Sequence, residues 1–170
     1  KEFIDLSSPP KNSPYPIIRM WSNFKMLKYR NKSDKLAKYL RHSRSDLSGI
    51  HKSYLEGTCT LPQRALAEQL YLNICHLVRN KLDTSCSEQR RVLKELDLFM
   101  ADKVYVNFSL FRSMPDSWGI NQVFPVVPIE GLEKAPERRA IILDITCDSD
   151  GAIRKYTGGS DTMPMPEYKA

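Results

Sequence analysis

The side chains best suited to chemistry in this sequence lie in one short segment, Asp144-Ile145-Thr146-Cys147-Asp148-Ser149-Asp150-Gly151. The segment offers a thiol, several carboxylates and a glycine, and three interpretations compete. Its spacing alone favours a turn after a strand, because Asp-Gly is typical of such turns. A calcium-binding loop starting at Thr146 would need an acidic residue at its twelfth position, where Thr157 stands instead. The calcium interpretation therefore fails.

The Cys147 thiol is the third interpretation, and its neighbours define what it could do. Asp148 and Asp150 carry negative charges that disfavour a thiolate, so the thiol stays protonated near neutral pH. A protonated thiol is a better proton donor than nucleophile. No histidine lies close in sequence to serve as its base, so a Cys–His pair of the protease kind has no support.

The other cysteines and the histidines show no metal-binding pattern. The four cysteines form no Cys-x-x-Cys pair and the three histidines are scattered, so we expect neither a disulfide framework nor a structural zinc site. This cysteine usage favours a reducing compartment, the cytoplasm. No apolar run approaches the ~20 residues that span a bilayer, so we expect no transmembrane helix.

Helical periodicity governs residues 16–102, which follow a linker at 1–15. Apolar residues recur there every three to four positions. Thr60-Leu61-Pro62-Gln63 is the sequence of a capping box with proline in the first turn, so it predicts the start of a helix. Gly49 is expected to end the helix before it. The pattern predicts a bundle of three or four antiparallel helices.

From residue 103 the apolar period falls to two, which indicates strands. We expect one strand over 104–111, an edge or irregular strand over 123–129 because it contains two prolines, and a third over 140–145. The fold class is therefore α+β, with a helical bundle followed by part of a β-domain at 103–170. These strands need further neighbours to cover their faces and edges, so we expect them to belong to a larger domain.

The charge of the chain suggests one alternative function. The net charge is +6, but residues 19–52 hold ten basic side chains against two acidic ones, a local charge of +8. Such a segment could be a basic helical module that binds nucleic acid or an acidic protein partner. The charges fall between apolar positions, as on any solvated helix face, and no base-stacking motif accompanies them. This alternative is therefore the weaker one.

Several long motifs resemble those of the biosynthetic arginine decarboxylase family. They include the run from Tyr105 to Ile120, Pro136-Glu137-Arg138-Arg139-Ala140, the run from Leu143 to Gly151, and Thr162 to Tyr168. Ala67-Glu68-Gln69-Leu70-Tyr71-Leu72 in the helical part is similar to the same family. The motifs occur in the family's order and together span most of the chain.

The resemblance implies a pyridoxal-phosphate enzyme built from a (β/α)₈ barrel and a C-terminal β-domain, with a helical bundle inserted between them. This chain would then be the insertion and the start of the β-domain. The family converts L-arginine to agmatine and CO₂ for polyamine biosynthesis, with pyridoxal phosphate as electron sink and with Mg²⁺. The family also implies a homo-oligomer, a dimer or tetramer, whose active sites form at a dimer interface.

Three residues carry over from the family by position. Cys147 matches the cysteine that protonates the decarboxylated carbon, and Asp148 matches the neighbouring aspartate that binds the distal cation of the substrate from the partner subunit. A carboxylate suits a guanidinium because its two oxygens accept parallel N–H bonds. Asp116 matches a second acid near that cation, and a turn residue after Pro115 is an equally good interpretation of it.

The resemblance also implies what this chain lacks. The family's Schiff-base lysine and glycine-rich phosphate loop belong to the barrel, and no lysine here lies in the matching context. We therefore expect no cofactor-binding residue in this chain and no decarboxylation by the chain alone. The Mg²⁺ ligands are not identified by any motif.

Overall fold

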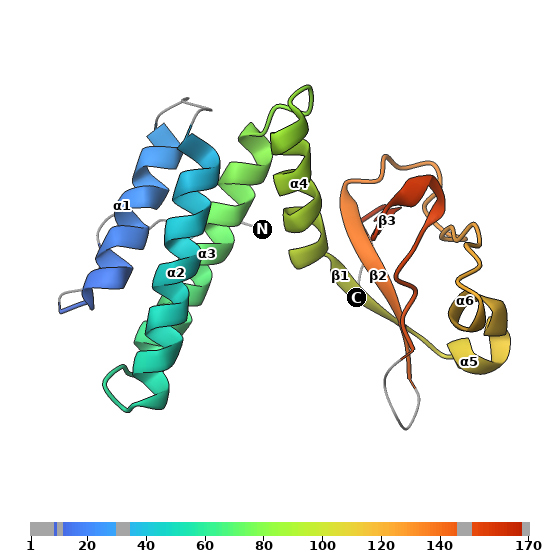
Figure 1. Cartoon of the computed structure of the whole chain (residues 1–170), viewed down its shortest axis with the longest axis horizontal. Coiled ribbons are helices and arrows are strands. Elements are labelled where there is room, and N and C mark those ends of the chain that lie inside the picture. The colour runs from blue at the N-terminus through green and yellow to red at the C-terminus, as the bar shows by residue number, and fades with distance from the viewer. Residues whose placement is uncertain (1–8, 10–11, 30–34, 146–150, 168–170) are drawn as a thin grey trace. The chain divides into compact units, whose positions relative to one another are not determined.

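The structure is a computed structural model that describes residues 9, 12–29, 35–145 and 151–167. The chain divides into two compact units, Lys1–Leu93 and Lys94–Ala170. Helices fill the first unit and a small sheet organises the second (Figure 1). No described helix is both long enough and apolar enough to cross a bilayer.

Three helices form the bundle: α1 (Tyr15–Tyr29), α2 (Leu36–Leu55) and α3 (Leu61–Lys81), each in contact with the other two. Figure 1 shows them side by side. Their apolar residues recur at helical spacing, so each helix turns one apolar stripe inward. The stripes bury Ile17, Met20, Phe24 and Leu27 of α1, Leu36, Leu40 and Ile50 of α2, and Ala67, Leu70, Ile74 and Val78 of α3.

Local signals fix some helix ends and not others. The capping box before α3 is confirmed: the Thr60 side chain accepts a hydrogen bond from the Gln63 backbone, and the Gln63 side chain accepts one from the Thr60 backbone. The prediction that Gly49 ends a helix is wrong, because α2 continues to Leu55. The buried Ile50 follows directly, so packing of the stripe outweighs the modest helix cost of a glycine.

The second unit begins within α4 (Ser87–Phe99), which leads into β1 (Asp102–Val106). The predicted strand over 104–111 is too long: the chain leaves the sheet after Val106 and turns into the short helices α5 (Leu110–Ser113) and α6 (Pro115–Gly119). Ser109 causes the change, since its side chain accepts a hydrogen bond from the Arg112 backbone and caps α5.

The sheet has the order β1-β2-β3 among the described residues, with β2 at Arg138–Asp144 and β3 at Met163–Met165. β1 and β2 are parallel, and β2 and β3 are antiparallel. The strand predicted over 123–129 is wrong, because those residues form no strand; Pro125 and Pro128 have no N–H to donate to a ladder. The core of this unit consists of Leu110, Ala140, Ile142, Ile153, Tyr156 and Met163.

Candidate functional site

Two of the three predicted site residues, Cys147 and Asp148, lie outside the described residues. The residues that flank them pair with each other. The Asp144 backbone N–H donates to the Gly151 carbonyl at 2.9 Å, and the Ile153 N–H donates to the Ile142 carbonyl at 3.0 Å. Leu143 pairs with Ala152 in antiparallel fashion. The chain therefore reverses direction between Asp144 and Gly151, as the turn interpretation predicted.

The Asp144 side chain is a functional candidate that the sequence reasoning missed. It is 1% exposed, at the end of β2. Its Oδ2 accepts a hydrogen bond from the Leu110 backbone N–H, the first of α5, at 3.0 Å. The signal was present in the sequence: Ala140, Ile142 and Asp144 alternate along one face of the strand, so the aspartate falls at a core position.

Gly151 is required by close packing as well as by the turn. A Cβ at this position would lie far inside van der Waals contact of the Asp144 Cγ. Glycine is needed here because the buried carboxylate occupies the space that any side chain would fill.

Asp116, the third predicted site residue, lies in the first turn of α6 and is exposed. Its carbonyl accepts hydrogen bonds from the backbone of Ile120 at 3.3 Å and of Gln122 at 2.9 Å, so it shapes the chain as the turn interpretation proposed. The α5–α6 segment is also braced internally, because Trp118 Nε1 donates to the Phe111 carbonyl at 3.3 Å. The exposed carboxylate keeps its second interpretation open.

The chain after Gly151 is held to β2 by one buried hydrogen bond and by the partly buried hydrogen bonds of Arg139. The Ile142 N–H donates to the Tyr156 hydroxyl at 2.9 Å, and burial raises the pKa of that phenol. Arg139 Nε donates to the Thr162 hydroxyl at 2.9 Å and its Nη2 to the Ser160 hydroxyl at 2.7 Å. These contacts fix the strand that follows the reversal against the strand that precedes it.

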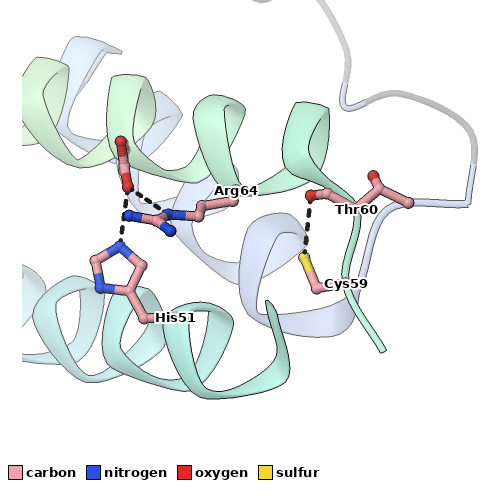
Figure 2. Close-up of polar contacts among 5 residues, drawn as sticks. His51, Cys59, Thr60 and Arg64 are labelled. Carbon is pink, nitrogen blue, oxygen red and sulfur yellow. Dashed lines mark hydrogen bonds and ion pairs between the residues drawn. The ribbon is translucent and has the colours of Figure 1, made fainter. Parts of the chain in front are cut away.

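The bundle contains polar contacts that serve its own packing. His51 of α2 and Arg64 of α3 point at one carboxylate, that of Glu68, from 3.1 Å and 2.9 Å (Figure 2). The hydrogen bond from Arg64 is the main reason that the pKa of Glu68 is lowered, with a smaller contribution from His51. Figure 2 also shows the Cys59 thiol directed at the Thr60 carbonyl, 3.6 Å away.

The other described thiols are poor candidates for catalysis. Burial raises the pKa of Cys75 to about 11, so this thiol stays protonated and inert at neutral pH. Cys59 is buried, whereas Cys86 is exposed. All three are free.

The basic side chains of residues 19–52 take part in internal contacts. Arg19 forms an ion pair with Asp46, and the hydrogen bond between them is the main reason that the pKa of Arg19 is raised. Arg44 Nε donates to the Tyr71 hydroxyl at 3.1 Å. The segment therefore contributes to the bundle's own packing as well as to its surface charge.

Candidate metal ligands and one pocket of the second unit can be compared with the groups that the family implies. No group of three acidic, cysteine or histidine side chains in the described ranges could hold a metal ion. A pocket of the second unit is lined by Lys94, Asp97 and residues 158–162. Its carboxylates, Asp97 and Asp161, would repel the phosphate of the cofactor, and no aromatic ring lines it to stack on the pyridine.

Fold and site together define a class: a helical-bundle domain followed in the chain by a small mixed sheet, whose middle strand ends at a buried aspartate and a chain reversal. The family profile described as the arginine decarboxylase helical bundle domain matches residues 10–97, more than half of the chain. The chain belongs to this family.

Relatives and a solved structure extend the similarity to the rest of the chain. A biosynthetic arginine decarboxylase of Klebsiella pneumoniae is 51% identical over 98% of this chain, which spans 27% of that relative. One from Salmonella newport is 48% identical with the same coverage. The crystal structure of the biosynthetic arginine decarboxylase from Campylobacter jejuni is 30% identical with a TM-score of 0.66, over 99% of this chain and 25% of that one. The chain thus spans about a quarter of each.

Proposed function

We propose that this chain is part of a pyridoxal-phosphate-dependent arginine decarboxylase that converts L-arginine to agmatine and CO₂. The observation that carries the proposal is the 51% identity to a biosynthetic arginine decarboxylase along 98% of the chain. That identity covers the sheet unit as well as the bundle. The cytoplasm is the proposed compartment, which fits three free cysteines among the described residues.

In this proposal Cys147 delivers the proton to the carbon that has lost CO₂. Its thiol suits that role because the neighbouring carboxylates keep it protonated at neutral pH. The Asp148 carboxylate accepts paired hydrogen bonds from the guanidinium of arginine, and Asp116 adds a second negative charge near that cation. The exposure of Asp116 supports its part, because its carboxylate is available to a ligand.

The cofactor and Mg²⁺ would be bound by parts of the enzyme other than the described residues. The proposed enzyme is a homo-oligomer, a dimer or tetramer, in which Asp148 reaches the site of the partner subunit. The chain alone is expected to form no agmatine from arginine.

The test uses the full-length enzyme and measures agmatine formation from arginine. Cys147→Ala should lower kcat by about a hundredfold, the usual scale for losing a general acid. Cys86→Ala is the matched control, since Cys86 is an exposed free thiol outside the proposed site. Asp148→Asn should mainly weaken the preference for arginine over lysine. An unchanged kcat in Cys147→Ala, or full-length enzyme that forms no agmatine, would overturn the proposal.

A further inference from the structure

We propose that Asp144 is a positioning residue for the decarboxylase site. It ties the two residues that flank the Cys147 segment, Asp144 itself and Gly151, to the start of the helical segment that holds Asp116. This inference rests on the proposed function. In the proposed enzyme Asp144 touches neither substrate nor cofactor. Its single carboxylate contacts two stretches of chain that are far apart in sequence.

The first support is the cost of placing a carboxylate there. Asp144 is 1% exposed, and it shares the inward face of β2 with Ala140 and Ile142. Burying an ionisable group is unfavourable unless hydrogen bonds compensate it, and an aliphatic residue would complete this face more simply. A carboxylate at this position therefore needs a reason other than core packing.

The second support is the bond to α5. Leu110 is 5% exposed, and its backbone N–H lies in the first turn of the helix, where no carbonyl of the helix can accept it. The Asp144 Oδ2 accepts this hydrogen bond at 3.0 Å. From Leu110 the chain runs directly into α6, because the Leu110 carbonyl accepts from the Met114 N–H at 2.9 Å and the Met114 carbonyl from the Ser117 N–H at 3.1 Å. Asp116 lies inside this last turn.

The third support is the fit of Gly151. The Asp144 backbone N–H is bonded to the Gly151 carbonyl, and the Asp144 carboxylate lies where a Gly151 side chain would be. Both ends of the six residues 145–150 are therefore held at one point. The same carboxylate that holds α5 also sets how closely these ends approach. A change at Asp144 should consequently disturb Cys147 and Asp116 together.

The experiment is a double-mutant cycle on kcat in the full-length holoenzyme, with Asp144→Asn, Cys147→Ala and the double variant. Asp144→Asn keeps an acceptor for Leu110 but removes the charge, and we expect kcat to fall about tenfold through misplacement of the proton donor. In the Cys147→Ala background the same change should alter kcat less than twofold, because the group it positions is gone. Asp161→Asn, at an exposed ion pair with Lys155, is the matched control and should leave kcat unchanged.

Gly151→Ala tests the same contact from the other side and serves if Asp144→Asn yields no folded holoenzyme. Its Cβ would collide with the carboxylate, whereas Gly49→Ala, a control in α2, meets nothing within 4 Å. Gly151→Ala should lower kcat about tenfold in the Cys147 enzyme and less than twofold in Cys147→Ala.

Each outcome decides between the two proposals. An equal loss in both backgrounds would mean a general structural role and would overturn the inference. Wild-type kcat in Asp144→Asn and Gly151→Ala, with Cys147→Ala impaired, would overturn the inference alone. Wild-type kcat in Cys147→Ala would overturn the proposed proton donor, and the inference with it.

Discussion

The bundle and the sheet unit bury their residues to different degrees. In the bundle, three helices enclose one apolar core, and buried polar groups bond across it: the Asp46 carboxylate with Arg19, and the Asn23 amide with the Ser43 hydroxyl at 3.2 Å. The sheet unit leaves more large apolar side chains exposed. Among its described residues, more than half of the surface is exposed for Phe99, Tyr105, Trp118, Ile120, Val127, Ile129, Leu132 and Ile145, whereas in the first unit this holds for Tyr15, Tyr29, Leu55 and Leu61.

This difference indicates that the more stable unit and the unit with the proposed site are not the same. Three mutually packed helices bury their apolar faces against one another, whereas a sheet of three short strands has edges and faces that need neighbours. The chain spans about a quarter of its relatives' length, and the proposed site residues all lie in the unit with the exposed apolar surface. We infer that the bundle can fold without the rest of an enzyme. The sheet unit, in contrast, needs the rest of the enzyme in order to fold.

The strongest test separates the two regions at the loop after α3. Residues 1–84 should be helical by circular dichroism and should unfold in one cooperative thermal transition. Residues 85–170 should show no cooperative transition, because their small core cannot offset the entropy of ordering the chain. Among the predictions this is the largest effect, because the separated sheet unit should lose all of its free energy of unfolding. A cooperative transition of residues 85–170 would refute the comparison.

The sequence predicts the bundle better than the sheet unit, for physical reasons. Helical periodicity and the Thr60 capping box are local signals, and the interactions behind them span three or four residues. Gly49 misleads because its effect on the helix is smaller than the packing of the stripe that continues at Ile50.

The sheet unit depends on contacts between residues far apart in sequence. Alternation up to Leu110 predicts a continued strand, but the bond from the Leu110 N–H to Asp144, 34 residues away, belongs to a helix start. No local pattern announces that bond. The resemblance identifies Cys147 and Asp148 as candidates. The alternation along the strand places Asp144 on the inward face, but only the fold shows that its carboxylate accepts a hydrogen bond from Leu110.

An ion pair with one buried partner tests how much the polar contacts contribute to the stability of the bundle. The Asp46 side chain is 1% exposed and bonds Arg19, whose side chain is 44% exposed. Asp46→Ala should lower the free energy of unfolding by about 2 kcal/mol, less than for a fully buried pair because Arg19 can turn to water. Glu56→Ala is the control: its pair with Lys52 spans 3.8 Å at the surface and should change stability by less than about 0.5 kcal/mol. Equal losses in urea unfolding of the 170-residue chain would contradict the role of burial.

The smallest expected effect concerns the acid limit of the bundle. Arg64 and His51 lower the pKa of Glu68 below its ordinary value of 4.5, so the ionised form stabilises the folded state. That contribution is present above about pH 4.5 and is lost as the pH falls through the lower pKa of the folded state. Because the Glu68 side chain is 43% exposed, the contribution should be only about 0.5 kcal/mol.

Glu68→Gln isolates this contribution. In urea unfolding at pH 6 the variant should be less stable than the parent chain, and the difference should shrink as the pH falls toward 3 and Glu68 takes up a proton in the folded state as well. In 1 M salt the difference at pH 6 should shrink, because salt screens a half-exposed pair. A difference that persists unchanged at pH 3 would show that Glu68 acts by packing rather than by charge. The α2–α3 contact would then belong with the apolar core.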